Sequence, residues 1–523
     1  MINKIKNIDS KLLLYLSISI FALEPLIGLD YLAYDFLNSL HLPLLSTIFH
    51  LIYLPLVVIL VFTKLENKKK LWMTIVGLYL FIVLVYAILH SINAIAIFDS
   101  LYLTNNFYFS IFKEFIYIYT LIIPYFICYV FVKSEINKNL IKRVLLAISL
   151  FISLAIVLGD IFTFGFSTYL PTNTQASIFT WASNNPDILH PRALTSKFFY
   201  LEGNTLGIYL FTLLPILYYY LSLAKVKKEK FIISFIIFIQ SIAMVILGTK
   251  VATFGSLLIA IIMVVVYLLF LFLKQISLNK FYLSFVTIMI VILAFLLPIS
   301  PAYINTQIDN ANDTIVLEDD YLLQEGKEGA KAGEQLVPGT AEFNYFYINY
   351  FEDYGIKSNL ASSIPKEYYS LYYNYKFDGK FWWDVLDLYP LEERTSGRQI
   401  ETIFTKYKWE PTSTYTKFMG LGYTTFMNGS IVIETDFLMQ MYLFGYFGSV
   451  LLLAPYIVVL FYGLIKVIMD FKNKFKYETI VFAMAYLIAL GSAYTSGHTL
   501  DQYLTTSLIA LIVSVLLRNV GNK

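Results

Sequence analysis

The chain has 523 residues, of which 58% are hydrophobic and only 14% are charged. This composition lies outside the usual range of soluble domains and within that of integral membrane proteins. The formal net charge of +2 gives no sign of nucleic-acid binding, and a single cysteine, Cys128, excludes an intrachain disulfide and a cysteine-based metal site.

About twelve apolar runs follow one another along the chain, each close to the roughly 20 residues that a membrane-spanning helix needs. The first run follows Lys4, Lys6 and Lys11 and has no small-residue cleavage pattern, so we interpret it as a retained span rather than a signal peptide. The sequence therefore predicts an all-α polytopic membrane protein. The runs lie near 12–29, 39–63, 71–89, 108–132, 144–166, 203–224, 231–249, 252–273, 281–300, 437–465, 478–496 and 503–517.

The basic residues indicate the orientation of these spans. With both termini in the cytoplasm, the inner loops 64–70, 133–143, 225–230, 274–280 and 466–477 each carry at least two Lys or Arg. The short outer loops carry only Arg192, Lys197 and Lys250. This asymmetry follows the positive-inside rule.

One long segment, 301–433, separates a membrane domain over 1–300, with nine spans, from a second over 434–523, with three. The same orientation places this segment outside. Its part 306–342 is acidic and rich in Gly and Ala, which is typical of a flexible linker. Its part 343–433 is rich in aromatic residues, twenty of them within 343–410. We expect it to form a helical cap, the aromatic cap, whose rings either stack on sugars or build its own core.

Charged residues gather at two outer positions. In "ILHPRALTSKFFYLEGNTLGIYL", Arg192 and Asn204 lie at the mouth of a span, where a helix N-terminus favours an anion and a guanidinium can grip phosphate with two hydrogen bonds. In "ILGTKVATFGSLL", Lys250 lies on a tight turn between two spans, well placed to meet a lipid-linked phosphate. The alternative for both basic residues is ordinary contact with lipid headgroups.

Arg398 breaks a local rule of helix electrostatics. In "EERTSGRQIETIF", Thr395 or Ser396 can cap a helix that begins near Gly397, which places Arg398 in its first turn. A basic residue there opposes the helix dipole, and local departures of this kind concentrate at functional sites.

These motifs, in this order, are similar to those of the bacterial O-antigen polymerase and O-antigen ligase superfamily. "PRALTSKFFYLEGNTLGIYL" resembles the Arg-then-Asn segment that opens a central span, and "LGTKVATFGSLL" resembles a short turn in which arginine is commoner than Lys250. "SGRQIETIFTKYKWEPTSTYTKFMGLGY" and "ETDFLMQMYLFGYFGSVLLL" resemble the end of the large outer loop, its Gly-x-Gly, and the re-entering span. The resemblance covers about residues 145 to 465. A histidine normally precedes that span in the ligase branch; Glu434 and Asp436 stand here instead, which favours polymerase.

The resemblance implies a membrane-embedded glycosyltransferase that polymerises undecaprenyl pyrophosphate-linked repeat units at the outer face of the bacterial cytoplasmic membrane, for a capsule, exopolysaccharide or O-antigen. No cofactor or metal site is visible. The partners would be lipid-linked donor and acceptor, membrane lipid, a flippase and a chain-length regulator, with no nucleic acid.

We assign pyrophosphate binding to Arg192, Asn204, Lys250 and Arg398. Arg398 is also assigned to catalysis, with Glu434 or Asp436 as the base unless these two merely suit the dipole of their helix.

Two further residues and three competing functions remain open at this point. His498, in "SGHTLDQY", is a weaker candidate for the base, and Glu24, in the first span, is a buried carboxylate that we expect to face protein. An O-antigen-ligase-type transferase shares the motifs. A transporter of lipid-linked oligosaccharide would show paired halves with broken helices, which the single large loop does not suggest. A sensor or adhesion platform would leave Arg192 and Lys250 without a role.

Overall fold

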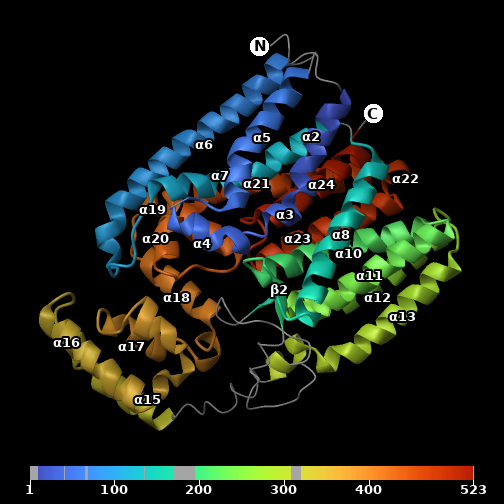
Figure 1. The fold of residues 1–523 in the computed structure, drawn as a ribbon. Coiled ribbons are helices and arrows are strands. Elements are labelled where there is room, and N and C mark those ends of the chain that lie inside the picture. The colour runs from blue at the N-terminus through green and yellow to red at the C-terminus, as the bar shows by residue number, and fades with distance from the viewer. Residues whose placement is uncertain are drawn as a thin grey trace. The chain divides into compact units, whose positions relative to one another are not determined.

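The computed structural model describes residues 10–40, 42–64, 69–134, 136–168, 195–307 and 320–521, and these are almost entirely helical (Figure 1). The strands in this described part form one short antiparallel ribbon, β1 (Phe166–Ser167) with β2 (Ser196–Phe198). The prediction of an all-α polytopic membrane protein is confirmed. Arg192 lies outside the described residues.

Ten helices in the described part are long and apolar enough to cross a membrane. Two further apolar helices, α2 (Ser10–Ala22) and α5 (Leu45–Lys64), have shorter apolar stretches and match the first two predicted runs. The ten are α6 (Lys69–Ile97), α7 (Ile111–Lys133), α8 (Lys138–Ile161), α10 (Gly203–Leu223), α11 (Lys227–Leu247), α12 (Lys250–Phe272), α13 (Lys280–Leu296), α21 (Asp436–Met469), α23 (Tyr477–Thr495) and α24 (Tyr503–Val520).

The other helical elements are short. Those before residue 308 are α3 (Glu24–Ile27), α4 (Tyr31–Ser39), η1 (Phe98–Leu101) and η3 (Leu297–Ile299). The segment from 320 to 435 contains α15 (Asp320–Ala330), η4 (Gly333–Gln335), α16 (Ala341–Tyr350), η5 (Phe351–Lys357), η6 (Leu360–Ser363), η7 (Tyr368–Tyr372), α17 (Gly379–Leu388), η8 (Leu391–Glu393), α18 (Gly397–Trp409), α19 (Thr414–Met419) and α20 (Tyr423–Asn428). After α21 comes α22 (Phe471–Lys474).

The chain divides into two compact units. Unit 1 comprises 1–76, 119–307 and 453–523, and unit 2 comprises 77–118 and 308–452. The long helices α6, α7 and α21 contribute residues to both. The sequence predicts three parts, 1–300, 301–433 and 434–523, which separate the membrane spans from the outer segment. The two units are defined by packing instead, so this three-part division stays a prediction.

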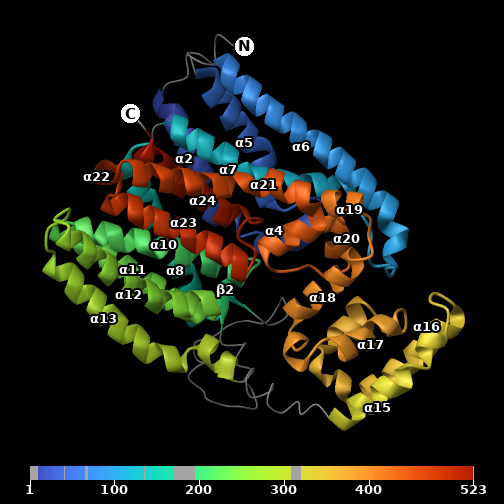
Figure 2. The ribbon, with the colours of Figure 1, turned by 180° about the vertical axis from the view of Figure 1, so that it is seen from behind.

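Unit 1 is built around α10. Almost every residue of this helix is buried, which is the pattern of a helix enclosed by others on all sides. It packs against α11, α12 and α23, and α8 packs against α11 (Figure 2). The buried carboxylate expected in the first span finds a partner here, since Glu24 Oε1 lies 2.7 Å from His50 Nε2.

Unit 2 contains the aromatic cap, whose core is made of rings that pack mostly edge to face. Trp382 and Trp383 are fully buried, and the indole N–H of Trp382 donates to the carbonyl of Tyr373 at 2.7 Å. Arg394 is also buried, and its guanidinium donates to the carbonyl oxygens of Leu386 and Tyr389. These rings form the interior of the cap. This was one of the two interpretations that the sequence allowed for its aromatic residues.

The stretch 306–342, expected to be a flexible acidic linker, contains a helix in the structure. Residues 308–319 lie outside the described part, but α15 follows directly. Its Gly326 packs against the ring of Trp383, and the hydroxyl of Tyr350 donates to the Gly326 carbonyl at 2.5 Å. The large rings of the aromatic cap thus order a segment whose own composition is too polar to form a core.

Lys408 lies inside the aromatic cap and links it to the η1 segment. Its side chain is 5% exposed, and its ammonium group donates to the Tyr373 hydroxyl at 2.9 Å and to the Tyr102 carbonyl at 3.0 Å and lies 3.7 Å from Asp378. Burial lowers the pKa of Lys408 to about 8, although the Asp378 carboxylate opposes the shift. At pH values between about 8 and the ordinary lysine pKa, Lys408 is protonated in the unfolded chain but has released its proton in the folded chain.

Raising the pH through this interval should therefore stabilise the folded cap. We expect the stability of the native protein relative to a Lys408→Met variant to rise by about 1–2 kcal/mol between pH 7.5 and 9.5. Thermal unfolding of both proteins in detergent at the two pH values measures the difference. A difference that is constant or falls with pH would contradict this prediction.

Candidate active site

Glycine at the N-terminal end of α10 lets Thr168 pack closely against the helix. The helix begins at Gly203, and a Cβ built there would lie 2.2 Å from Cγ2 of Thr168, which follows β1. Asn204, in the first turn, is partly exposed. The first amides of a helix have no intrahelical acceptor, so hydrogen-bond donors are expected at this end, and anion binding by Asn204 stays a prediction.

The turn with Lys250 packs against the same part of α10. Only Gly248, with φ of 73°, and Thr249 separate α11 from α12, and the Thr249 hydroxyl accepts from the amide of Ala252. A Cβ built on Gly207 of α10 would lie 2.5 Å from that hydroxyl oxygen. Lys250 is the first residue of α12 and is exposed. The predicted tight turn is confirmed, one helical turn away from Asn204.

The segment that follows Arg192 reaches this turn as well. A Cβ built on Gly248 would lie 2.1 Å from Cγ2 of Thr195, and the Thr195 carbonyl accepts from the amide of Thr168 at 3.2 Å. Thr195 is three residues after Arg192. The described end of the first motif, from Thr195 onward, thus packs on the turn before Lys250 in unit 1.

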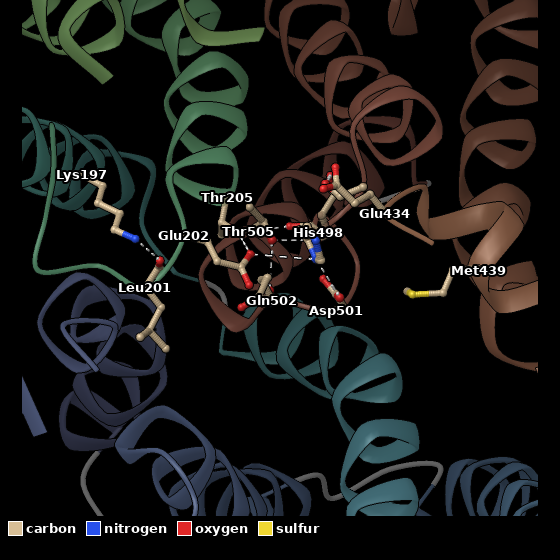
Figure 3. Close-up of polar contacts among 12 residues, drawn as sticks. Lys197, Leu201, Glu202, Thr205, Glu434, Met439, His498, Asp501, Gln502 and Thr505 are labelled. Carbon is tan, nitrogen blue, oxygen red and sulfur yellow. Dashed lines mark hydrogen bonds and ion pairs between the residues drawn. The ribbon is translucent and has the colours of Figure 1, made fainter. Parts of the chain in front are cut away.

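A cluster of ionisable side chains lies beside the first turn of α10 (Figure 3). His498 Nδ1 is 3.2 Å from Asp501 Oδ2 and 3.9 Å from Glu202 Oε2, and Glu202 also accepts from the Thr205 hydroxyl at 3.1 Å. The sequence analysis ranked His498 below Glu434. The available signal was the spacing in "SGHTLDQY", which puts an aspartate three residues after the histidine.

Lys197 does not join this cluster. Its ammonium group donates to the carbonyl of Leu201 at 2.8 Å and is 8% exposed (Figure 3). Burial lowers the pKa of Lys197, against the opposing effect of the Glu202 carboxylate. This lysine therefore ties β2 to Leu201, two residues before α10, and has a structural role.

In unit 2, Arg398 is paired with Glu434. The predicted N-terminus of α18 is confirmed, because the Ser396 hydroxyl accepts from the amide of Gln399 and the Gln399 side chain bonds back to Ser396. Arg398 lies in the first turn, and its Nε forms an ion pair with Glu434 Oε2. The exposed fractions of the two side chains are 44% and 31%, so both can meet a ligand. The structure thus joins two residues that the sequence assigned to one reaction.

Asp436 has a different environment from Glu434. It is the first residue of α21 and is fully buried. A carboxylate in the first turn is favoured by the helix dipole, so the structural role considered for this residue matches its position. Glu434, two residues earlier, is the acidic side chain that reaches the surface near Arg398.

The turn between α19 and α20 packs against the interior of α21, beside the break in that helix at Gly445. Gly420 and Gly422 have φ of 96° and 94°, and the amide of Gly422 donates to the carbonyl of Leu443 in α21 at 2.9 Å. From α6, the His90 ring bonds the carbonyl of Met419 at 2.6 Å, and the Asn93 amide donates to the carbonyl of Gly420 at 2.8 Å. Irregular backbone in a membrane protein needs such protein partners.

Glu114 of α7 completes this support. One carboxylate oxygen lies 2.8 Å from His90 Nε2 and accepts from the amide of Tyr423, and the other accepts from the amide of Thr424 at 2.9 Å. His90 and Glu114 are both fully buried. The sequence analysis missed this pair, although an ionisable residue inside an apolar run is itself a signal. Through the turn, the pair is linked to the interior of α21 at Leu443.

Comparison with known proteins agrees with this architecture. A family model described as O-antigen ligase like membrane protein matches residues 6–523. No curated protein and no solved structure matches the chain. The match covers nearly the whole chain, including the ten apolar helices, and identifies a multi-pass membrane protein. The chain belongs to the family of O-antigen ligase like membrane proteins.

Proposed function

We propose that the protein is a membrane-embedded glycosyltransferase that joins undecaprenyl pyrophosphate-linked repeat units into a cell-surface polysaccharide. Its family supports the coarser statement that it is a membrane glycan-processing enzyme. The observation that carries the finer proposal is the packing of the Lys250 turn against the N-terminal end of α10. Lys250, the exposed first residue of α12, follows this turn directly, and a cation close to helix amides is suited to bind a phosphate group.

In this reaction a hydroxyl of the acceptor unit attacks the anomeric carbon of the donor sugar. The bond from that carbon to the pyrophosphate oxygen breaks, and the lipid pyrophosphate leaves with the electron pair. Negative charge grows on the leaving group, and prearranged cations and N–H donors stabilise it. The proposal assigns this task to Arg192, Lys250 and Arg398, with Asn204 as a hydrogen-bond donor. Glu434 and Asp436 are the acidic residues that the sequence assigns to deprotonation.

The proposal also fixes an orientation. Segment 301–433 would lie outside the cytoplasmic membrane and both termini in the cytoplasm, as the distribution of Lys and Arg predicts. Undecaprenyl-linked units brought across by a flippase would then meet the aromatic cap and the exposed Arg398. A chain-length regulator would act at the same face.

A ligase-type transferase is the second candidate, because the family is named for that activity. It would share the leaving group and differ in the acceptor, which would be another carrier rather than a second lipid-linked unit. Glu434, at the position where the resemblance leads us to expect a histidine in ligases, favours polymerase. A transporter would need no group that stabilises a leaving pyrophosphate.

A deletion strain separates these three functions. For a polymerase, we expect the long polymer to disappear while single lipid-linked repeat units persist at the outer face. Loss of a ligase would leave long lipid-linked chains unattached, and loss of a transporter would leave units at the inner face. Extraction of lipid-linked glycans, sized by mass spectrometry, measures this. Long lipid-linked chains in the deletion strain would contradict the polymerase proposal.

A further inference from the structure

A cavity of unit 1 lies at the C-terminal end of α10, at the opposite end of this helix from the site described above. Its volume is about 680 Å³, and it is lined by the last residues of α10, the residues that lead into α11, and the segment that joins α12 to α13. With 21 residues and a rise of about 1.5 Å per residue, α10 separates its two ends by about 30 Å. A group bound in this cavity is therefore distinct from a pyrophosphate bound at the N-terminal end of α10.

Three lysines line this cavity, which we call the basic pocket. Lys225 precedes α11, Lys230 lies in the first turn of α11, and Lys280 is the first residue of α13. The described residues that line the pocket include no Asp or Glu. Glu229, the neighbour of Lys230, forms an ion pair with Lys142 of α8 instead. The pocket therefore carries an excess of positive charge.

Hydrogen bonds fix the walls of the basic pocket. The hydroxyl of Tyr267, a fully buried residue of α12, donates to the carbonyl of Ser277 at 3.0 Å and accepts from the amide of Asn279 at 2.6 Å. The side-chain amide of Asn279 donates to the carbonyl of Ser222, near the end of α10, at 3.1 Å. Ser222, Ser277 and Asn279 all line the pocket, so its shape is formed without a ligand.

The cations of the basic pocket are placed for a negatively charged group. Both α11 and α13 begin with a lysine, Lys227 and Lys280, although a cation in the first turn opposes the dipole of its own helix. The ammonium of Lys230 lies 5.5 Å from the centre of the Phe281 ring, which also lines the pocket. An anion in the pocket would offset both the unfavourable dipole interaction and the repulsion among the ammonium groups.

The basic pocket also has an apolar wall that continues along α13. Leu223, Leu278 and Phe281 line the pocket, and all three are exposed. Ile288 and Phe295 follow Phe281 at intervals of about two helical turns, so these three side chains share one face of α13. They are exposed on a helix that is apolar enough to cross a membrane. An acyl chain can continue from the pocket along this stripe, whereas a water-soluble phosphate makes no use of it.

We propose that the basic pocket binds the phosphate headgroup of an anionic phospholipid, whose acyl chain lies along Phe281, Ile288 and Phe295. The distribution of Lys and Arg predicts that this end of α10 faces the cytoplasm, where anionic lipids give the membrane surface a negative potential. Basic pockets between spans on this side are typical sites for such headgroups. The bound lipid would join the ends of α10, α11 and α13, and it takes no part in the glycosyl transfer proposed above.

The test measures lipid binding by delipidated full-length protein in detergent, with phosphatidylglycerol as the probe and native mass spectrometry as the readout. The triple variant Lys225→Gln, Lys230→Gln, Lys280→Gln should bind this lipid at least about tenfold more weakly than the native protein, because three cations are lost. Phe281→Ala should also weaken binding, since it removes part of the apolar wall. Phosphatidylcholine with the same acyl chains should bind the native protein more weakly than phosphatidylglycerol, because its headgroup carries a cation.

The same two segments supply a matched control. Lys227, Lys228 and Lys274 are exposed and lie beside the three lysines of the basic pocket in sequence, but they do not line it. Replacing all three by glutamine removes the same charge and should leave the affinity within about twofold of the native value, because exposed charges are screened by salt. Equal losses in the two triple variants would show only a general attraction of lysines to anionic lipid and would overturn the proposal.

Two other results would contradict the proposal as well. One is an unchanged affinity in the pocket variant. The other is displacement of phosphatidylglycerol by an equal concentration of glycerol 3-phosphate, because the ligand would then be a water-soluble phosphate. If the triple variant does not fold, Lys225→Gln with Lys280→Gln replaces it, compared with Lys227→Gln with Lys274→Gln. Product lengthening is not the readout, so failure of the proposed function would leave this inference unaffected.

Discussion

Replacing Arg398 by alanine is expected to lower the rate of polymer formation by about 100- to 1,000-fold while the protein stays in the membrane at normal abundance. The reason is the loss of one prearranged electrostatic donor to the leaving pyrophosphate, which commonly costs about 2.7–4 kcal/mol of barrier. The Arg398 side chain is 44% exposed and lies at the start of α18, so the fold does not depend on it. Initial rates with lipid-linked repeat units measure the effect.

The same helix offers a matched control. Lys406, near the end of α18, is 47% exposed and pairs with Glu410 as Arg398 pairs with Glu434. Lys406→Ala should therefore leave the rate within about twofold of the native value, because an exposed ion pair contributes little. We expect Lys250→Ala to behave like Arg398→Ala and Lys250→Arg to retain activity. If Arg398→Ala and Lys406→Ala had equally small effects, a catalytic role of Arg398 would be contradicted. Contact with lipid headgroups would then be the remaining role for Arg398.

Glu114→Ala is expected to destabilise unit 2 by about 3–5 kcal/mol, because it leaves several buried hydrogen-bond donors unpaired at a cost of about 1–3 kcal/mol each. The variant leaves His90 without its carboxylate and exposes the amides of Tyr423 and Thr424 as unpaired donors in the interior. Denaturant unfolding in mixed micelles, followed by tryptophan fluorescence of the aromatic cap, measures the loss.

Asp353→Ala is the control for this measurement. Asp353 pairs with Lys357 in the same unit, but the two side chains are 57% and 65% exposed. Its removal should change stability by no more than about 0.5 kcal/mol. If both substitutions changed stability by the same small amount, the His90–Glu114 pair would not be what holds the turn.

Local features of the site were predictable from the sequence because local interactions determine them. Ser396 and Gln399 cap α18 through contacts three residues apart, so the position of Arg398 in the first turn followed from the motif. The two-residue turn before Lys250 followed from the separation of two apolar runs. The all-helical fold followed from the length of those runs.

Long-range contacts could not be predicted in this way. His90 and Glu114 lie in neighbouring spans, and Glu114 bonds the amide of Tyr423 across 309 residues of sequence. The pairing of His498 with Glu202 likewise depends on how α10 packs against α23 and α24. Apolar periodicity specifies that these helices are buried, but not which of their polar groups meet.

The measurement that tests the central claim most directly uses purified native protein and undecaprenyl pyrophosphate-linked repeat units alone, without nucleotide sugar or another acceptor. A polymerase uses one such unit as donor and another as acceptor, so the account predicts a ladder of lipid-linked products that differ by one repeat unit. Arg398→Ala should give a ladder at least a hundredfold slower. Folded native protein that yields no lengthened product, or that transfers units only when a different acceptor is added, would contradict the account.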